Sequence, residues 1–323
     1  MKSIGGFFEL EMRDAVEYHR HALRLNSGRN ALEYVLRARR YRKVHLPLYT
    51  CDVLFQPIVR LGIASAVYHI NEHFEPVFDF ASLRQDEALV YVNYFGLFDD
   101  VIESVAKKCS SLIVDNAQAF YARPVPGVDT FYSPRKFFGI PDGAYLYTDH
   151  RLTEPLERDK SYERCEHLLR RIDRGPEDAY PRFLESDEVF DTLPLRRMSS
   201  LTCRLLKSID YDEVARRRIS NFGLLHEALK GMNSIDCEPG DGQVPMVYPF
   251  LGPRKGLRDH LISKRIYVAR YWPKVLETAS KGSVEYEYAM NLVPLPVDHR
   301  YDASDMEVIA SAVIDYKGKE GLQ

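Results

Sequence analysis

Residues 112–148, LIVDNAQAFYARPVPGVDTFYSPRKFFGIPDGAYLYT, contain two short apolar runs with polar and turn-forming residues between them. The first run ends in Asp115, and the second, Ala144 to Tyr147, follows the turn-rich segment 139–143. Lys136 lies between the acid and that turn. A buried strand that delivers a carboxylate at its C-terminal end is typical of the functional edge of an open α/β sheet. The stretch therefore predicts two strands that bring one acid and one lysine to neighbouring strand ends.

An acid, a lysine and a nearby hydroxyl are the groups that pyridoxal phosphate requires of a protein. The lysine forms a Schiff base, the carboxylate keeps the pyridine nitrogen protonated, and hydroxyls and amides hold the phosphate. Ser133, one turn before Lys136, supplies the hydroxyl. Taken singly, Asp115 also suits a helix cap and Lys136 a solvated surface position. Their pairing in this order favours the cofactor.

The same segment resembles the core of the DegT/DnrJ/StrS sugar aminotransferases, which are pyridoxal phosphate enzymes of fold type I. Their D-x-A-[HQ]-A pattern is matched by residues 115–119, and their Schiff-base lysine, between a serine-bearing strand and a glycine-rich turn, by Lys136. The resemblance implies that Asp115 pairs with the pyridine nitrogen and that Gln118 lies beside the ring hydroxyl. It places Ser133 at the phosphate.

A serine–glycine turn precedes the helical pattern that follows residue 28. Such a turn leaves free backbone N–H groups at the positive end of a helix dipole, which suits a phosphate, although an ordinary N-cap at Ser27 or Asn30 has the same residue pattern. The S-G-[TR]-x-A-L turn of the resembled family is matched by residues 27–32. The resemblance therefore implies that Gly28 and Arg29 bind the phosphate, Arg29 through a charge-assisted contact.

The residue that covers the cofactor ring is left open between two positions. The resembled family places an aromatic residue there, whereas gap-free comparison puts Cys51 at that position, with Tyr49 two residues earlier. Tyr49 is favoured on physical grounds because a flat π-face suits a flat ring. A nucleophilic role for Cys51 would need a neighbouring base, and the sequence shows none.

The remaining pattern predicts an α/β fold with a mostly parallel sheet between helices, followed by a smaller α+β region. Strand-like and helical patterns alternate over residues 44–148, which favours parallel strands with helical crossovers. We expect a large cofactor-binding domain over residues 1–205 and a small C-terminal domain over 206–323. Helical spacing also predicts a helix over 14–25, and the charge-dense segment 151–190 is expected to be helix and loop. Strands are expected at 244–250, 266–272 and 291–297.

Two positions bear on substrate and subunit contacts. Arg270, beside the only tryptophan, is a candidate for gripping a donor carboxylate because its fork of N–H donors suits one; a surface arginine is the alternative. The asparagine with which the resembled family reaches the partner subunit's cofactor phosphate is replaced here by Leu195. The resemblance still implies a homodimer, without that contact.

Composition excludes several other classes of protein. The net charge is −3, without the basic excess of a nucleic-acid binder. No apolar run reaches the length of a membrane span, and acids interrupt the N-terminal apolar stretch, so neither a membrane anchor nor a signal peptide is expected. The five cysteines lack CxxC spacing, and no metal site is predicted. A cytoplasmic protein is expected.

These observations predict a pyridoxal-phosphate-dependent aminotransferase. The resemblance implies amino transfer from an amino acid, typically glutamate, to a nucleotide-linked keto sugar in polysaccharide or antibiotic sugar synthesis. A lyase or aldolase on the same fold, a non-catalytic binding or regulatory protein, and an α/β protein unrelated to the cofactor are the alternatives. Nothing in the sequence distinguishes one acceptor from another.

Overall fold

The computed structural model of the chain describes residues 4–253 and 255–318. The strands of the described chain are β1 (Leu23–Leu25), β2 (Lys43–Pro47), β3 (Ala64–Ile70), β4 (Pro76–Val77), β5 (Glu87–Val92), β6 (Leu112–Asp115), β7 (Asp129–Tyr132), β8 (Ala144–Tyr147), β9 (Val247–Phe250) and β10 (Val293–Pro296). The α-helices are α1 (Gly28–Arg39), α2 (Phe55–Arg60), α3 (Asp99–Ala106), α4 (Glu166–Arg174), α5 (Pro176–Glu188), α6 (Ser200–Lys207), α7 (Tyr211–Leu229), α8 (Leu257–Ser263), α9 (Val275–Thr278), α10 (Val284–Asn291) and α11 (Ala303–Ile314).

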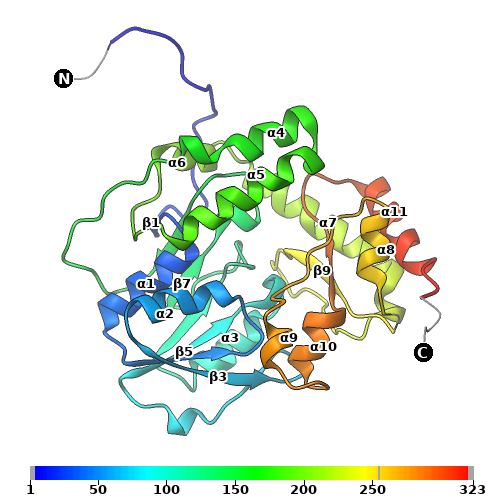
Figure 1. Ribbon diagram of the computed structural model, residues 1–323, viewed down its shortest axis with the longest axis horizontal. Coiled ribbons are helices and arrows are strands. Elements are labelled where there is room, and N and C mark those ends of the chain that lie inside the picture. The colour runs from blue at the N-terminus through cyan, green and yellow to red at the C-terminus, as the bar shows by residue number, and fades with distance from the viewer. Residues whose placement is uncertain (1–3, 254, 319–323) are drawn as a thin grey trace.

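The described strands form an eight-stranded sheet in the order β1-β8-β7-β6-β5-β2-β3-β4 and a separate β9–β10 pair. Strands β3, β2, β5, β6 and β7 run parallel to their neighbours within this set. The flanking pairs β7–β8, β8–β1 and β3–β4 are antiparallel. The predicted fold class, a mostly parallel sheet between helices, is therefore confirmed (Figure 1).

The central strand β5 shows why helices must cover both faces of the sheet. All six of its residues are buried, which is typical of a parallel strand with protein on both sides. Because successive side chains alternate, Ala88 and Val90 join the core formed with α1 and α2. Leu89 and Tyr91 join a second core with α3 and the C-terminal region.

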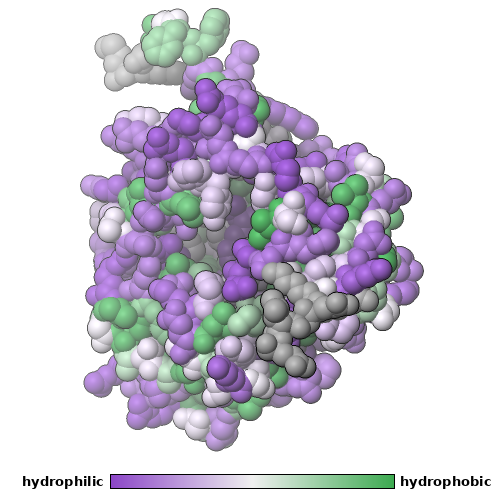
Figure 2. Space-filling model, turned by 45° about the vertical axis from the view of Figure 1, so that its right-hand side comes forward, coloured by the Kyte–Doolittle hydropathy of each residue, from purple (hydrophilic) through white to green (hydrophobic). Residues whose placement is uncertain are grey.

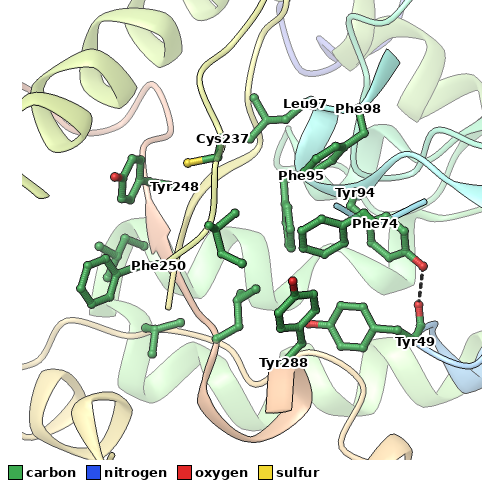
Figure 3. Close-up of a cluster of buried hydrophobic side chains, with 14 of the residues drawn as sticks. Tyr49, Phe74, Tyr94, Phe95, Leu97, Phe98, Cys237, Tyr248, Phe250 and Tyr288 are labelled. Carbon is green, nitrogen blue, oxygen red and sulfur yellow. Dashed lines mark hydrogen bonds between the residues drawn. The ribbon is translucent and has the colours of Figure 1, made fainter. Parts of the chain in front are cut away.

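The C-terminal region packs against the sheet through a continuous aromatic core. Figure 3 shows Phe74, Tyr94 and Phe95 on one side of this cluster and Tyr248 and Phe250 on the other. The proposed division at residues 205 and 206 falls inside α6, and we retain it as a proposal. Residues of the sheet and of the C-terminal region therefore share one buried core.

Two local predictions were wrong. Residues 14–22 form no helix, because β1 pairs with β8 and His19 is drawn into an aromatic cluster around Phe120. Tertiary pairing thus outweighs helical spacing at this end. Residues 266–272 form no strand: β9 pairs only with β10 among the described strands, and Trp272 has a left-handed φ of 51° that ends the extended run.

The segment before β1 extends away from the rest of the chain (Figures 1 and 2). It carries exposed apolar side chains, with Phe7 98% and Phe8 93% exposed. Helices α4 and α5 form a hairpin within the charge-dense segment, as predicted for helix and loop. No helix in the described ranges has the length and apolar character needed to cross a membrane.

Candidate functional site

Asp115 ends β6 and is 5% exposed. The backbone N–H of Ala117 donates to its carboxylate at 2.7 Å, so the chain turns sharply after the strand and closes onto its last side chain. Burial raises the pKa of Asp115, while the positive charge of Lys136 and the amide of Ala117 oppose that rise. The site thus holds a buried carboxylate that needs a cationic partner.

Lys136 ends the 3₁₀ turn η4 (Pro134–Lys136), which directly follows β7 and Ser133. Its backbone N–H donates to the carbonyl of Ser133 at 3.1 Å, which fixes the turn, and its side chain is exposed. The charge of Lys136 acts on both Asp115 and Cys51, lowering the pKa of each against the larger effect of burial. The structure therefore brings the predicted acid and lysine together.

The predicted phosphate residues also meet. Gly28 is the first residue of α1, and a Cβ built there would lie 3.8 Å from the Cβ of Ser133. Ser27 caps the helix by accepting from the Asn30 N–H at 3.3 Å. The first turn of α1 contains no acid, so its positive dipole end is uncompensated within the helix. A phosphate would meet backbone donors and a hydroxyl here.

Arg29 lies next to this turn, but its guanidinium is already engaged. It is 7% exposed, donates to Oε1 of Gln56 at 2.5 Å and pairs with the carboxylate of Asp191. Asp191 belongs to the 3₁₀ turn η6 (Val189–Asp191), which follows α5. The predicted phosphate arginine therefore shares its charge with an acid that the sequence pattern did not indicate.

Gln118 provides a test of whether the residues suit the cofactor. The backbone N–H of Phe95 donates to Oε1 of Gln118 at 2.9 Å, which fixes the orientation of the amide. Its Nε2 is buried without a hydrogen-bond partner among the described residues. A buried donor left open is costly unless a ligand supplies an acceptor. The ring hydroxyl of pyridoxal phosphate would fit that requirement.

The structure favours Cys51 over Tyr49 as the residue at the cofactor ring. Tyr49 has no exposed surface; Trp272 packs edge-on at 4.4 Å between ring centroids, and the Tyr94 hydroxyl donates to the Tyr49 carbonyl (Figure 3). The charge of Lys136 lowers the pKa of Cys51 and that of Asp115 raises it, whereas neither charge affects the pKa of Tyr49. Cys51 is therefore the nearer of the two to the predicted acid and lysine. Burial raises the pKa of the Cys51 thiol, which disfavours a nucleophilic thiolate.

The donor-carboxylate candidate, Arg270, is exposed and makes no hydrogen bond or ion pair with another described residue. The buried cation of this region is instead Arg218 on α7, 2% exposed, with its guanidinium 4.5 Å from the ring centroid of Phe137. Arg218 donates to the carbonyl of Met246 at 2.9 Å, and burial lowers its pKa to about 10.

Further residues around the site were missed by the sequence pattern. Asp142 is fully buried and accepts from both the N–H and the hydroxyl of Ser199, at 2.9 and 2.7 Å, and so ties the glycine turn to the start of α6. Asn93 donates to the side chain of Asn116 at 3.1 Å, beside Asp115. Leu195 packs in the core, and its apolar side chain cannot make the phosphate contact of the asparagine that the resembled family has at this position. In the sequence, only the Asp142–Gly143 turn indicated that residues near Asp142 belong to the site.

Comparison with solved structures shows that sugar aminotransferases share this fold. The sugar aminotransferase CalS13 from Micromonospora echinospora aligns with a TM-score of 0.63 at 15% identity, covering 91% of this chain and 87% of its own. A DegT DnrJ EryC1 StrS aminotransferase from Brucella abortus aligns with a TM-score of 0.62 at 16% identity, covering 93% and 86%.

Spr1654 from Streptococcus pneumoniae, in its pyridoxal phosphate form, aligns with a TM-score of 0.62 at 12% identity, covering 90% of this chain and 86% of its own. No protein-family model matches the chain, and no curated protein matches it in sequence. The likeness therefore concerns the fold, and it confirms the architecture that the sequence resemblance implied.

Proposed function

We propose that the protein is a pyridoxal-phosphate-dependent aminotransferase that transfers an amino group from an amino acid, with glutamate as the first candidate, to a keto sugar. The meeting of Lys136 and the buried Asp115 at adjoining strand ends carries this proposal. The α1 N-terminus with Gly28 and Ser133 provides a place for the phosphate. The open amide of Gln118 provides a donor for the ring.

Each residue has a distinct task in this proposal. Bound pyridoxal phosphate supplies an electron-withdrawing ring next to the amino carbon of the donor. Asp115 holds a proton on the ring nitrogen, and its burial strengthens that pairing because few water molecules compete. The Nζ amine of Lys136 anchors the cofactor and then moves the donor's α-proton as a general base. Gln118 and Ser133 orient the ring hydroxyl and the phosphate.

The acceptor class rests on the structural neighbours. CalS13 is a sugar aminotransferase, and this chain shares its fold over most of both lengths. A nucleotide-linked keto sugar is accordingly the acceptor that we propose, with polysaccharide or sugar biosynthesis in the cytoplasm as the setting. Arg270, exposed and without a partner among the described residues, remains the proposed contact for the donor carboxylate.

A homodimer is part of the same proposal. Phe7 and Phe8 carry large apolar side chains into solvent, and on α4 and α5 Ile172 and Tyr180 are 82% and 58% exposed. Burial of such side chains against a second copy would be favourable. Helix α5 of the same hairpin pairs through Asp187 with Arg135, the neighbour of Lys136, so a second copy seated on the hairpin would lie close to the proposed site.

The absorption spectrum of the purified protein, with and without added pyridoxal phosphate, tests the proposal. We expect a visible band in the wild type that is absent from Lys136→Ala and that bleaches on addition of glutamate. A matched control is Lys160→Ala, which removes another exposed lysine outside the site and should leave the band intact.

Two other outcomes of this experiment would favour the alternative functions. A band that no amino donor bleaches would favour a lyase or aldolase. No band at any cofactor concentration would exclude the enzymatic proposal and favour a binding or regulatory protein with this fold.

A further inference from the structure

Two arginines, one buried and one mostly buried, lie at the phosphate end of the proposed site. Arg29 is the second residue of α1, after Gly28, and Arg135 precedes Lys136 on the η4 turn. They are close enough for the charge of Arg29 to lower the pKa of Arg135, in addition to the larger effect of burial. Together with the α1 dipole they form a strongly positive environment.

One segment of chain neutralises both arginines. Asp191 of η6 pairs with Arg29, and Asp187 of α5 accepts from Nη2 of Arg135 at 3.1 Å. Between these two acids, the ring of Phe190 is fully buried and its centroid lies 4.1 Å from the Arg135 guanidinium. The arginine side chains are 7% and 16% exposed, whereas those of Asp191 and Asp187 are 52% and 48% exposed. The cations are thus fixed, and the acids reach them from the solvent side.

Helix α5 contacts the C-terminal region at its other end. Glu177, near the start of α5, accepts from Arg265 at 2.5 Å and from the hydroxyl of Tyr267 at 2.6 Å. In Figure 1, α5 crosses the molecule toward α1 and α2. The helix therefore connects the C-terminal region to Arg135 through Asp187, and the η6 turn that follows it brings Asp191 to Arg29.

A phosphate dianion at Gly28 and Ser133 would draw on the charge of Arg29, which Asp191 already uses. Gln56 bridges the two, donating to Asp191 at 3.0 Å and accepting from Arg29 at 2.5 Å. A carboxylate that keeps its own contact with the cation lowers the attraction left for a second anion. We propose that Asp191 sets the affinity of the cofactor site by competing with the phosphate for Arg29. This inference rests on the proposed function.

The test compares binding of inorganic phosphate, by calorimetry, and of pyridoxal phosphate, by the visible band, in the wild type and Asp191→Asn. The variant keeps the shape and hydrogen bonds of the side chain but removes its charge. We expect both ligands to bind about fivefold more tightly, since a half-exposed ion pair is worth at most about 1 kcal/mol. Glu185→Gln is the matched control, because Glu185 lies on α5 shortly before the η6 turn and, among the described residues, its carboxylate pairs with Arg182 alone.

A double-mutant cycle tests whether Asp191 affects phosphate binding through Arg29. In an Arg29→Gln background, Asp191→Asn should no longer tighten binding, because the cation under competition is gone. Unchanged or weaker phosphate binding by Asp191→Asn alone, or equal tightening by Glu185→Gln, would overturn the inference. A wild type without a visible band would instead defeat the proposed function, while the phosphate titration would still decide the role of Asp191.

Discussion

The Nε2 atom of His19 lies 2.7 Å from the carbonyl oxygen of Phe120, inside a cluster of aromatic rings. Its Nδ1 lies 3.1 Å from the hydroxyl of Tyr147, so a neutral ring with a proton on Nε2 satisfies both contacts. Burial lowers the pKa of His19 to about 4, against a smaller opposing effect of the Phe120 carbonyl. His19 is therefore a structural residue whose imidazole is uncharged in the folded protein at neutral pH.

The first prediction concerns pH. Because the folded pKa is depressed, the unfolded chain binds the proton first, and stability falls as the pH drops from about 6.5 to about 4. The total loss from this group is about 3 kcal/mol. Denaturant unfolding at several pH values measures it. In His19→Gln, less stable at neutral pH, the difference from the wild type should shrink on acidification; a constant difference would contradict the assignment.

The second prediction concerns Asp115. Asp115→Asn keeps an oxygen for the Ala117 N–H but removes the charge that holds the ring nitrogen protonated. We expect the rate of amino transfer to fall about a hundredfold or more, with the fold retained by circular dichroism. Unaltered turnover in steady-state assays would rule out this role for the carboxylate.

The third prediction separates Cys51 from Tyr49. Tyr49→Leu removes the buried aromatic ring, so stability should fall while the affinity for pyridoxal phosphate should be nearly unchanged. Cys51→Ala should weaken pyridoxal phosphate binding about threefold to tenfold, through lost contact with the ring. Titration of the visible band measures both. A larger loss of cofactor affinity in Tyr49→Leu than in Cys51→Ala would reverse the choice.

The fourth prediction concerns the junction at Asp142. This carboxylate is fully buried and accepts from Ser199 and from the hydroxyl of Thr202 at the start of α6. Asp142→Ala leaves those donors without an acceptor and should lower the free energy of unfolding by about 3 kcal/mol. Asp149→Ala, an exposed acid just after β8, is the control and should change stability by less than about 0.5 kcal/mol.

The fifth prediction concerns the N-terminal segment. Phe7→Ser with Phe8→Ser touches no core residue, since both side chains are almost fully exposed. Stability of the single chain should therefore be unchanged, while the dimer proposed above should dissociate at higher protein concentration than in the wild type. Analytical ultracentrifugation measures this. Identical association of the two proteins would place the interface elsewhere.

The local pattern of the sequence determined much of this protein. The apolar runs around Asp115 and the repeated change between strand and helix patterns predicted the parallel core, because a buried strand is apolar on both faces. The turn at Gly28, the acid and the lysine were each marked by their neighbours in the chain. These features depend on residues a few positions apart, which a sequence shows directly.

Only the tertiary structure decided which distant residues pair with or pack against those residues. The pairing of the buried Arg29 with the half-exposed Asp191 joins residues far apart in the chain, and no periodicity of the sequence indicates such a contact. The burial of Tyr49 against Trp272 likewise depends on where the C-terminal region packs. Residues 14–22 lost their helical preference to the pairing of β1 with β8. Long-range packing energy outweighs local propensity at such places, so the sequence alone could not settle them.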